Sequence, residues 1–209
     1  MNLLLVAATE LEIAPFLKTN YQADILITGV GIPATIFHLT KKLITKKYDL
    51  VIQAGIAGTF NDQLSLSNVV MVKKDTFGDI GIEEKGKLFS LFETGFIDKN
   101  DFPYTNGWII NDNTLLENID LPVVNAITIN KIGDNILQNK MVREKFLADI
   151  ESMEGAAFHY VCMQEKIKFL QLRSISNRVG ERDKSKWQLK NAIINLNNEL
   201  IKITEKIQL

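Results

Sequence analysis

The sequence is poor in cysteine and histidine and has no excess charge of either sign. Its 209 residues include one cysteine and two histidines, and 24 Lys and Arg side chains face 25 Asp and Glu. Because Cys162 has no second cysteine to pair with, an internal disulfide is excluded. His38 and His159 lie far apart, and no Cys and His cluster has the spacing of a metal site. We therefore expect no metal, no cofactor and no nucleic-acid partner.

Long apolar runs are missing as well. The N-terminal stretch 2–8 is too short for a secretion signal, and acidic residues follow it at once. No run approaches the length that crosses a bilayer, so the sequence predicts a cytoplasmic protein without a membrane partner. Cys162 lies in an apolar helical stretch and is interpreted as a small core residue.

What the sequence does contain is an alternation of short aliphatic runs and longer amphipathic stretches. Strands are predicted at residues 2–8, 23–28, 49–54, 67–74, 122–129, 149–153 and 167–176, and helices at 10–18, 32–46, 137–147, 153–166 and 183–207. Several strands, such as that around 50–52, are continuously apolar, as expected of strands covered on both faces. The alternation predicts an α/β fold with a largely parallel central sheet, in a single domain spanning residues 1–209. The segment 75–115 is irregular, with a short strand predicted at 88–92.

Polar or small residues stand where several of these strands end. Glu12 follows the first strand, the run Gln-Ala-Gly-Ile-Ala-Gly-Thr at 53–59 ends the third, and Glu154 and Asn177 follow the last two. In open α/β sheets, ligands bind at the edge where the carboxyl ends of parallel strands meet. If these strands are parallel, the four groups converge there.

Each of these residues also has a plain structural interpretation. Glu12 completes a capping box with Thr9, Glu154 complements the dipole of the helix that it precedes, and Asn177 can cap a turn. The segment 55–58 can be an ordinary glycine-rich turn. The coincidence of position, and no single motif, favours a binding site.

A further glycine motif, Gly-Val-Gly-Ile-Pro-Ala at 29–34, has the spacing of a dinucleotide fingerprint. That fingerprint needs an acidic residue at the end of the next strand, where Gln53 and Ala54 stand instead. We therefore interpret the motif as a tight strand-to-helix turn, with Pro33 in the first helical turn.

Four strings occur together in the chain: Ala-Thr-Glu-Leu-Glu at 8–12, Gly-Ile-Ala-Gly at 55–58, Ser-Met-Glu-Gly-Ala-Ala-Phe at 152–158 and Ser-Ile-Ser-Asn-Arg-Val-Gly-Glu-Arg-Asp at 174–183. In combination they resemble the nucleoside phosphorylase/nucleosidase family over essentially the whole chain, and within it the hydrolases that cleave futalosine. The resemblance implies a twisted mixed sheet flanked by helices in a three-layer sandwich, and a homo-oligomer. It also implies hydrolysis of the N-glycosidic bond of futalosine to hypoxanthine and dehypoxanthinyl futalosine, in menaquinone biosynthesis.

The resemblance also implies roles for single residues. Glu12 would activate the attacking water, Met153 would pack against the ribose, and Glu154 would hold the 2′- and 3′-hydroxyls. Asn177 would face the purine N7 and the substituent at C6. The family turn near the base matches Gly55–Gly58, and Ile56, Ala57 and Gly58 would contact the substrate.

The substituent at the ribose 5′ position needs an apolar pocket with a cation near its far end. Trp187, Arg178 and Arg182 are candidates because they follow Asn177 closely in the sequence. Trp187 equally fits the core at the start of the last helix, and the two arginines equally fit a solvated loop.

Two departures from the adenine-releasing nucleosidases bear on the substrate. Those enzymes carry Ser at the position of Ile56 and Asp at that of Asn177. An amide can accept a hydrogen bond from a protonated N7 and donate one to a 6-oxo group, whereas a carboxylate only accepts. The amide therefore predicts hypoxanthine as the leaving base.

Three alternatives remain open at this point. A methylthioadenosine/S-adenosylhomocysteine-type nucleosidase would release adenine, and a purine nucleoside phosphorylase would need basic ligands for phosphate. A non-catalytic nucleoside-binding module is disfavoured because Glu12 and Glu154 are both present.

Overall fold

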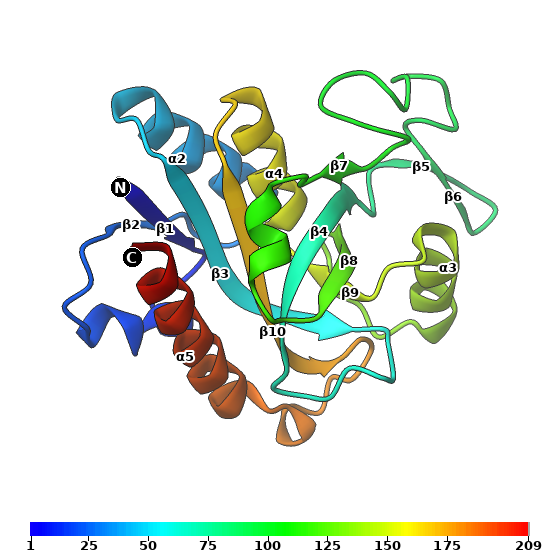
Figure 1. The fold of residues 1–209 in the computed structure, drawn as a ribbon. Helices are drawn as coiled ribbons and strands as arrows, with labels where there is room; N and C mark the ends of the chain where they lie inside the picture. The colour runs from blue at the N-terminus through cyan, green and yellow to red at the C-terminus, as the bar shows by residue number, and fades with distance from the viewer. Residues whose placement is uncertain (209) are drawn as a thin grey trace.

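The computed structural model, which describes residues 1–208, has a mixed sheet with helices on both faces (Figure 1). The strands of this sheet are β1 (Leu3–Ala7), β2 (Asp24–Ile27), β3 (Leu50–Thr59), β4 (Val69–Phe77), β7 (Ile109–Ile110), β8 (Val123–Thr128), β9 (Ile150–Ser152) and β10 (Phe169–Arg178). The α-helices are α1 (Glu10–Ile13), α2 (Ile32–Thr45), α3 (Ile136–Phe146), α4 (Gly155–Gln164) and α5 (Leu189–Gln208). Among the described helices, none combines the length and the hydropathy needed to span a bilayer.

The sheet is not flat, because five of its strands close into a ring. β3 pairs with β10, β10 with β4, β4 with β8, β8 with β9, and β9 again with β3. The pairings of β10 with β4 and of β9 with β3 are antiparallel, and the others in the ring are parallel. β1 and β2 extend the sheet beyond β3 in the parallel sense. The expected mixed sheet flanked by helices is present. The three-layer sandwich does not describe the five strands of the ring, because they close on themselves.

Alternate side chains of the strands fill separate apolar layers. Leu3 and Leu5 of β1 join Leu196 of α5 in one buried cluster, whereas Leu4 joins Cys162 of α4 in another. Cys162 is thus a buried core residue, as predicted. A third cluster takes side chains from all five strands of the ring, namely Ala57, Val70, Val72, Val124, Ala126, Ile150 and Ile175.

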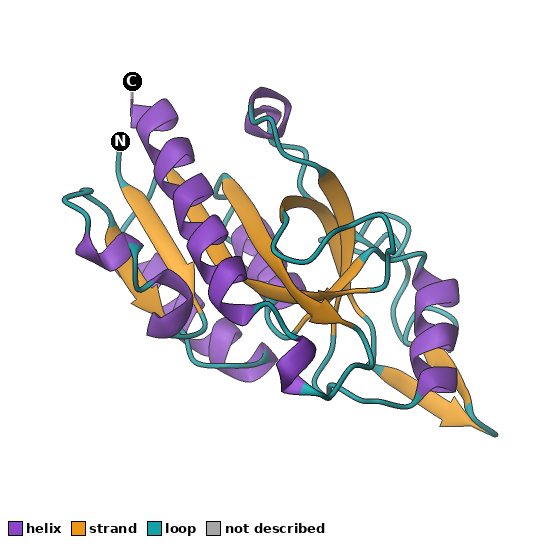
Figure 2. Ribbon diagram, turned by 90° about the horizontal axis from the view of Figure 1, so that it is seen from below, coloured by secondary structure: helices purple, strands orange, loops and turns teal. Residues whose placement is uncertain are grey.

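The helices lie on the two faces of the sheet. Figure 2 shows α5 running along one face, and both views place α3 beside a hairpin at the end of the molecule away from the termini. That hairpin consists of β5 (Gly81–Glu84) and β6 (Lys87–Ser90). It occupies the segment that was predicted to be irregular, and β6 lies close to the short strand predicted at 88–92.

Two predicted helices are shorter than expected. α1 ends at Ile13, and a 3-10 turn at Phe16–Lys18 follows. Pro15 explains the break, because it has no amide hydrogen and its ring clashes with the carbonyl of the preceding turn. The predicted helix 183–207 begins as a 3-10 turn at Lys184–Lys186, and α5 starts only at Leu189.

Two predicted strands continue past their expected carboxyl ends, and both reach the candidate site. β3 continues to Thr59, so the glycine-rich segment 55–58 is strand and not turn. β10 continues to Arg178 and contains Asn177. The two strands pair with each other as far as Thr59 and Arg178, and this tertiary pairing overrides the low strand propensity of glycine.

Candidate active site

A cavity of about 300 Å³ opens beside the ends of β1, β3, β9 and β10. Eight of the site residues predicted from the sequence line it, whereas the candidates Arg178 and Arg182 do not. The eight are Glu12, Ile56, Ala57, Gly58, Met153, Glu154, Asn177 and Trp187. Its volume is at the lower end of the range usual for small-molecule sites, about 300–1,000 Å³. A larger cavity, of about 720 Å³, lies between the β5–β6 hairpin and α3, and no predicted site residue is among the described residues that line it.

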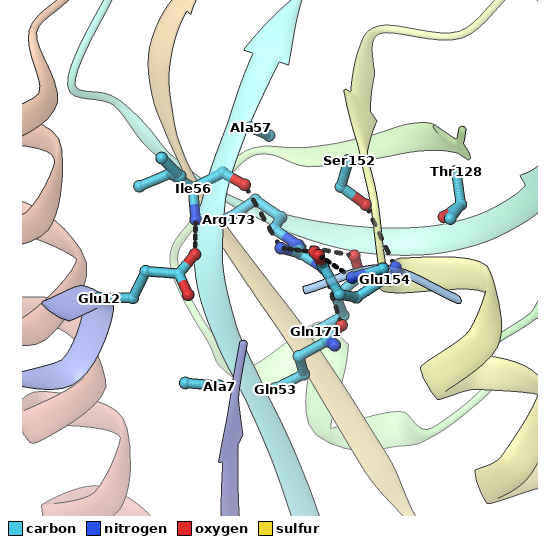
Figure 3. A network of polar contacts seen from close by, with 12 residues as sticks. Ala7, Glu12, Gln53, Ile56, Ala57, Thr128, Ser152, Glu154, Gln171 and Arg173 are labelled. Atoms are coloured by element: carbon cyan, nitrogen blue, oxygen red, sulfur yellow. Dashed lines mark hydrogen bonds and ion pairs between the residues drawn. The ribbon is translucent and has the colours of Figure 1, made fainter. Parts of the chain in front are cut away.

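The convergence on this cavity differs in one respect from the prediction. β1, β3 and β10 are parallel and bring Glu12, the Ile56–Gly58 segment and Asn177 to one edge, as expected. β9 runs antiparallel to β3, so strand direction alone does not bring Glu154 there. Instead, β9 pairs with Gly58 and Thr59 at the end of β3, and Glu154, two residues after β9 ends, lines the cavity from there. Figure 3 shows Glu12 and Glu154 on the two sides of β3, with Arg173 between them.

Glu12 is a buried carboxylate that is held at both oxygens. Its Oε1 accepts a hydrogen bond from the amide of Ile56 at 3.1 Å, and its Oε2 accepts from the amide and hydroxyl of Thr9, both at 3.0 Å. Burial raises the pKa of Glu12, and the positive charge of Arg173 opposes the rise. The capping box is therefore present, and burial also makes the same carboxylate a stronger base than an exposed one.

The glycine turn before α2 holds Glu154. The amide of Gly31 donates to Oε1 of Glu154 at 3.0 Å, and Oε2 lies 3.4 Å from Nη1 of Arg173. Gly29 and Gly31 have φ angles of 82° and 96°, a region that glycine adopts without strain. The predicted strand-to-helix turn, with proline in the first helical turn, is thus confirmed. Its backbone also orients a carboxylate in the cavity.

Arg173 is the centre of the hydrogen-bond network, and it was not predicted as a site residue. Its side chain is 1% exposed and donates to Oε1 of Gln53 at 2.9 Å, Oε1 of Gln171 at 3.0 Å and the carbonyl of Ile56 at 3.3 Å (Figure 3). A Cβ on Gly55 would lie 2.5 Å from its Nη1, so β3 needs glycine where it passes the guanidinium. An arginine inside an apolar strand was the available signal, because a buried charge requires partners.

Behind Arg173, the hydrogen bonds continue to Asp75 and His159. Nε2 of Gln171 lies 3.1 Å from Oδ2 of Asp75 and 2.9 Å from Nε2 of His159. Burial raises the pKa of Asp75 to about 6 and lowers the pKa of His159 to about 3. The neutral ring of His159 carries its hydrogen on Nδ1, because the carbonyl of Ile109, 3.1 Å away, can only accept. Nε2 then accepts from Gln171, so the network satisfies every member.

A bulge in β10 turns Asn177 towards the cavity. The register with β3 shifts between Ile175 and Asn177, and as a result both Ser176 and Asn177 line the cavity. Nδ2 of Asn177 donates to the carbonyl of Arg178 at 2.9 Å, and this contact identifies the NH₂ end of the amide because a carbonyl only accepts. The Ser176 hydroxyl donates to Oδ1 at 2.7 Å. One amide hydrogen and one oxygen lone pair remain for a ligand.

Trp187 is half-buried at one side of the cavity. Its indole donates to the carbonyl of Glu181 at 3.0 Å, and the guanidinium of Arg182 lies 5.9 Å from its ring centre. Arg178, the other arginine considered for the 5′ substituent, donates to the carbonyl of Asn61 at 2.6 Å and does not line the cavity. In residues 1–208, no group of His, Cys, Asp and Glu is arranged to hold a metal ion.

Comparisons with a family model and with curated proteins agree on one family of enzymes. The family model of the phosphorylase superfamily matches residues 16–207. A futalosine hydrolase from Thermus thermophilus is 27% identical over 207 residues, which cover 91% of this chain and 89% of the relative. A 5′-methylthioadenosine/S-adenosylhomocysteine nucleosidase from Tolumonas auensis is 26% identical, with 79% and 73% covered.

A solved structure extends the comparison to the fold. The native structure of a Helicobacter pylori futalosine hydrolase matches with a TM-score of 0.80 and covers 99% of this chain and 98% of its own. Its identity of 15% makes this a likeness of fold alone. Because the family model spans most of the sequence, the chain belongs to the phosphorylase superfamily.

Proposed function

We propose that the protein hydrolyses the N-glycosidic bond of futalosine and releases hypoxanthine and dehypoxanthinyl futalosine, a step of menaquinone biosynthesis. The observation that carries the proposal is the oriented amide of Asn177 in the cavity that also holds Glu12 and Glu154. The similarity to the futalosine hydrolase of Thermus thermophilus supports the same substrate. The family resemblance further supports a cytoplasmic enzyme built from identical subunits.

Asn177 acts at the base. As the bond to N9 breaks, negative charge builds on the departing purine, and a proton that N7 takes up from water relieves it. Oδ1 of Asn177 accepts from N7–H, while the free hydrogen on Nδ2 donates to the 6-oxo oxygen. A 6-amino group would place a donor against that hydrogen. The amide therefore favours hypoxanthine over adenine as the leaving group.

Glu12 and Glu154 act at the sugar, which gains positive charge in the transition state. Glu12 takes a proton from the attacking water, and its raised pKa suits this role. Glu154, fixed by Gly31 and Arg173, holds the ribose hydroxyls, and Met153 packs against the ring. Both carboxylates also stabilise the developing cation through space.

The lining of the cavity favours water over phosphate as the acceptor. No lysine or arginine is among the described residues that line it, so a phosphorylase would find no cation for its second substrate. The cation for the substrate carboxylate is absent from that lining too, and Arg182, beside the Trp187 ring, remains the candidate.

A methylthioadenosine-type nucleosidase is the second candidate, because the Tolumonas auensis relative has that activity in its name. The two functions are separated by incubating the protein with futalosine, inosine and methylthioadenosine in phosphate-free buffer and identifying the released base by chromatography. We expect hypoxanthine from futalosine. Adenine from methylthioadenosine, with futalosine untouched, would establish the second candidate instead.

A further inference from the structure

Glu151 is a second carboxylate at the base end of the cavity and has no part in the water, ribose or N7 contacts. Its side chain is 6% exposed and lines the cavity. No hydrogen bond or ion pair from residues 1–208 reaches its carboxylate, and burial together with the charge of Asp79 raises the pKa of Glu151 to about 7. Its oxygens are not among the fully enclosed side-chain atoms of residues 1–208 that lack a partner, so they face the open cavity, where a donor from a bound ligand would pair with them.

Glu151 and Asn177 flank the same glycine. Gly58 of β3 pairs with Glu151 of β9 on one side and with Asn177 of β10 on the other. Residues that face each other on neighbouring strands project to the same side of a sheet. Cγ of Glu151 and Nδ2 of Asn177 lie 3.5 Å and 3.4 Å from the point that a Cβ on Gly58 would occupy. The missing side chain of Gly58 therefore leaves one space that the carboxylate and the amide share.

We propose that Glu151 accepts a hydrogen bond from N1–H of a 6-oxopurine whose O6 and N7 face Asn177. The assignment rests on the proposed function and names the residue that would read a second position of the base. In a 6-oxopurine, N1–H is the donor next to C6, so a base with its oxo group at Asn177 presents this donor towards the adjacent group.

Adenine fails at the Asn177 contact, because its amino group opposes the NH₂ of the amide. It also fails at the ionised form of Glu151, because its N1 carries no hydrogen and only accepts. Since the pKa of Glu151 is raised to about 7, this second rejection is complete only above that pH. Glu151 and Asn177 thus read two neighbouring positions, and each of these differs between hypoxanthine and adenine. When two polar contacts each favour hypoxanthine over adenine, their preference factors multiply, whereas the amide of Asn177 alone supplies one factor.

Binding of free bases tests the assignment without turnover. The full chain is titrated calorimetrically at about pH 8.5, where a group with a pKa of about 7 is ionised, with hypoxanthine, 1-methylhypoxanthine and adenine, as wild type, Glu151→Gln and Glu151→Ala. The wild type should bind hypoxanthine about 10- to 100-fold more tightly than 1-methylhypoxanthine, as expected for one hydrogen bond to a charged group. Glu151→Gln keeps an acceptor oxygen and should retain part of the preference, whereas Glu151→Ala should lose it.

The exposed Glu117 provides the matched control, since Glu117→Ala should leave all three affinities unchanged. Equal affinity of the wild type for hypoxanthine and its 1-methyl form, or no affinity for either, overturns the role of Glu151. So does a Glu151→Ala protein that still rejects 1-methylhypoxanthine. Any of these results can occur in an enzyme that hydrolyses futalosine, and failure of that hydrolysis would overturn the proposed function separately.

Discussion

Replacing Gly55 with alanine should displace Arg173 and so weaken both the fold and the site. The new Cβ would lie 2.5 Å from Nη1 of Arg173 and 3.0 Å from Oε1 of Glu12. The guanidinium cannot swing into solvent, because it is almost fully buried and anchored by Gln53 and Gln171. Either β3 moves away from β10, or Arg173 loses some of its hydrogen bonds.

The cost of Gly55→Ala follows from two effects. Overpacking of a close-packed interior costs about 1–3 kcal/mol. Nη1 also donates to the carbonyl of Ile56 and pairs with Glu154, and losing one hydrogen bond to a charged group costs about 1.5–3 kcal/mol more. Together they remove about 2.5–6 kcal/mol from a free energy of unfolding that is typically about 5–15 kcal/mol. A shift of about 1 Å in the two carboxylates should also lower turnover by about 10²-fold.

Urea denaturation measures the stability of the Gly55→Ala protein, and the initial rate of hypoxanthine release from futalosine measures its turnover. Gly133→Ala is the matched control, because a Cβ there meets no atom within 4 Å. That control should change the free energy of unfolding by no more than about 0.5 kcal/mol. A Gly55→Ala protein within about 1 kcal/mol of wild type and with normal turnover would refute the role given to Arg173.

Three further predictions concern the general base Glu12, the selectivity of Asn177 for the leaving purine, and the buried His159. Glu12→Gln should lower the initial rate of futalosine hydrolysis by about 10²–10⁴-fold while calorimetry still detects hypoxanthine binding, and a near-normal rate would remove Glu12 from the mechanism. Asn177→Asp should raise adenine release from the 6-amino analogue of futalosine, relative to hypoxanthine release from futalosine, by about 10²-fold or more; an unchanged ratio would deny Asn177 its selectivity. The folded pKa of His159 is about 3, below the ordinary 6.5, so its stabilising contribution is full above pH 6.5 and is lost as the pH falls towards 3. Between about pH 7 and pH 5, urea denaturation should show wild type losing about 2 kcal/mol more than His159→Gln, and equal losses would contradict the buried neutral ring.

The helices and strands of the sheet were largely predictable because each is encoded locally. Runs such as Leu50–Ile52 are apolar on both faces, and the observed strand is covered on both. The closure of the ring was not predictable, because β9 has only three residues and meets β3 through two residue pairs. Its direction depends on contacts between segments about 90 residues apart, and no local pattern carries them.

The candidate site shows the same division. Glu12, Glu154 and Asn177 stand at or near the ends of β1, β9 and β10, and these three strands end within two residues of the predicted positions. Arg173 lies within a strand and is recognisable as central only from partners that are distant along the chain, such as Gln53. Glu151 belongs to a strand of three residues, too short for an alternation of polar and apolar residues to show which side chains face the cavity. Only the pairing of Glu151 with Gly58 in the structure shows that it lies there.

The most direct test compares futalosine with its 6-amino analogue, since the two substrates differ only at C6 and N1 of the base. With the wild-type protein in phosphate-free buffer, kcat/KM for hypoxanthine release from futalosine should exceed that for adenine release from the analogue by about 10²-fold or more. Equal values, or a preference for the 6-amino substrate, would contradict the selection of a 6-oxopurine by Asn177.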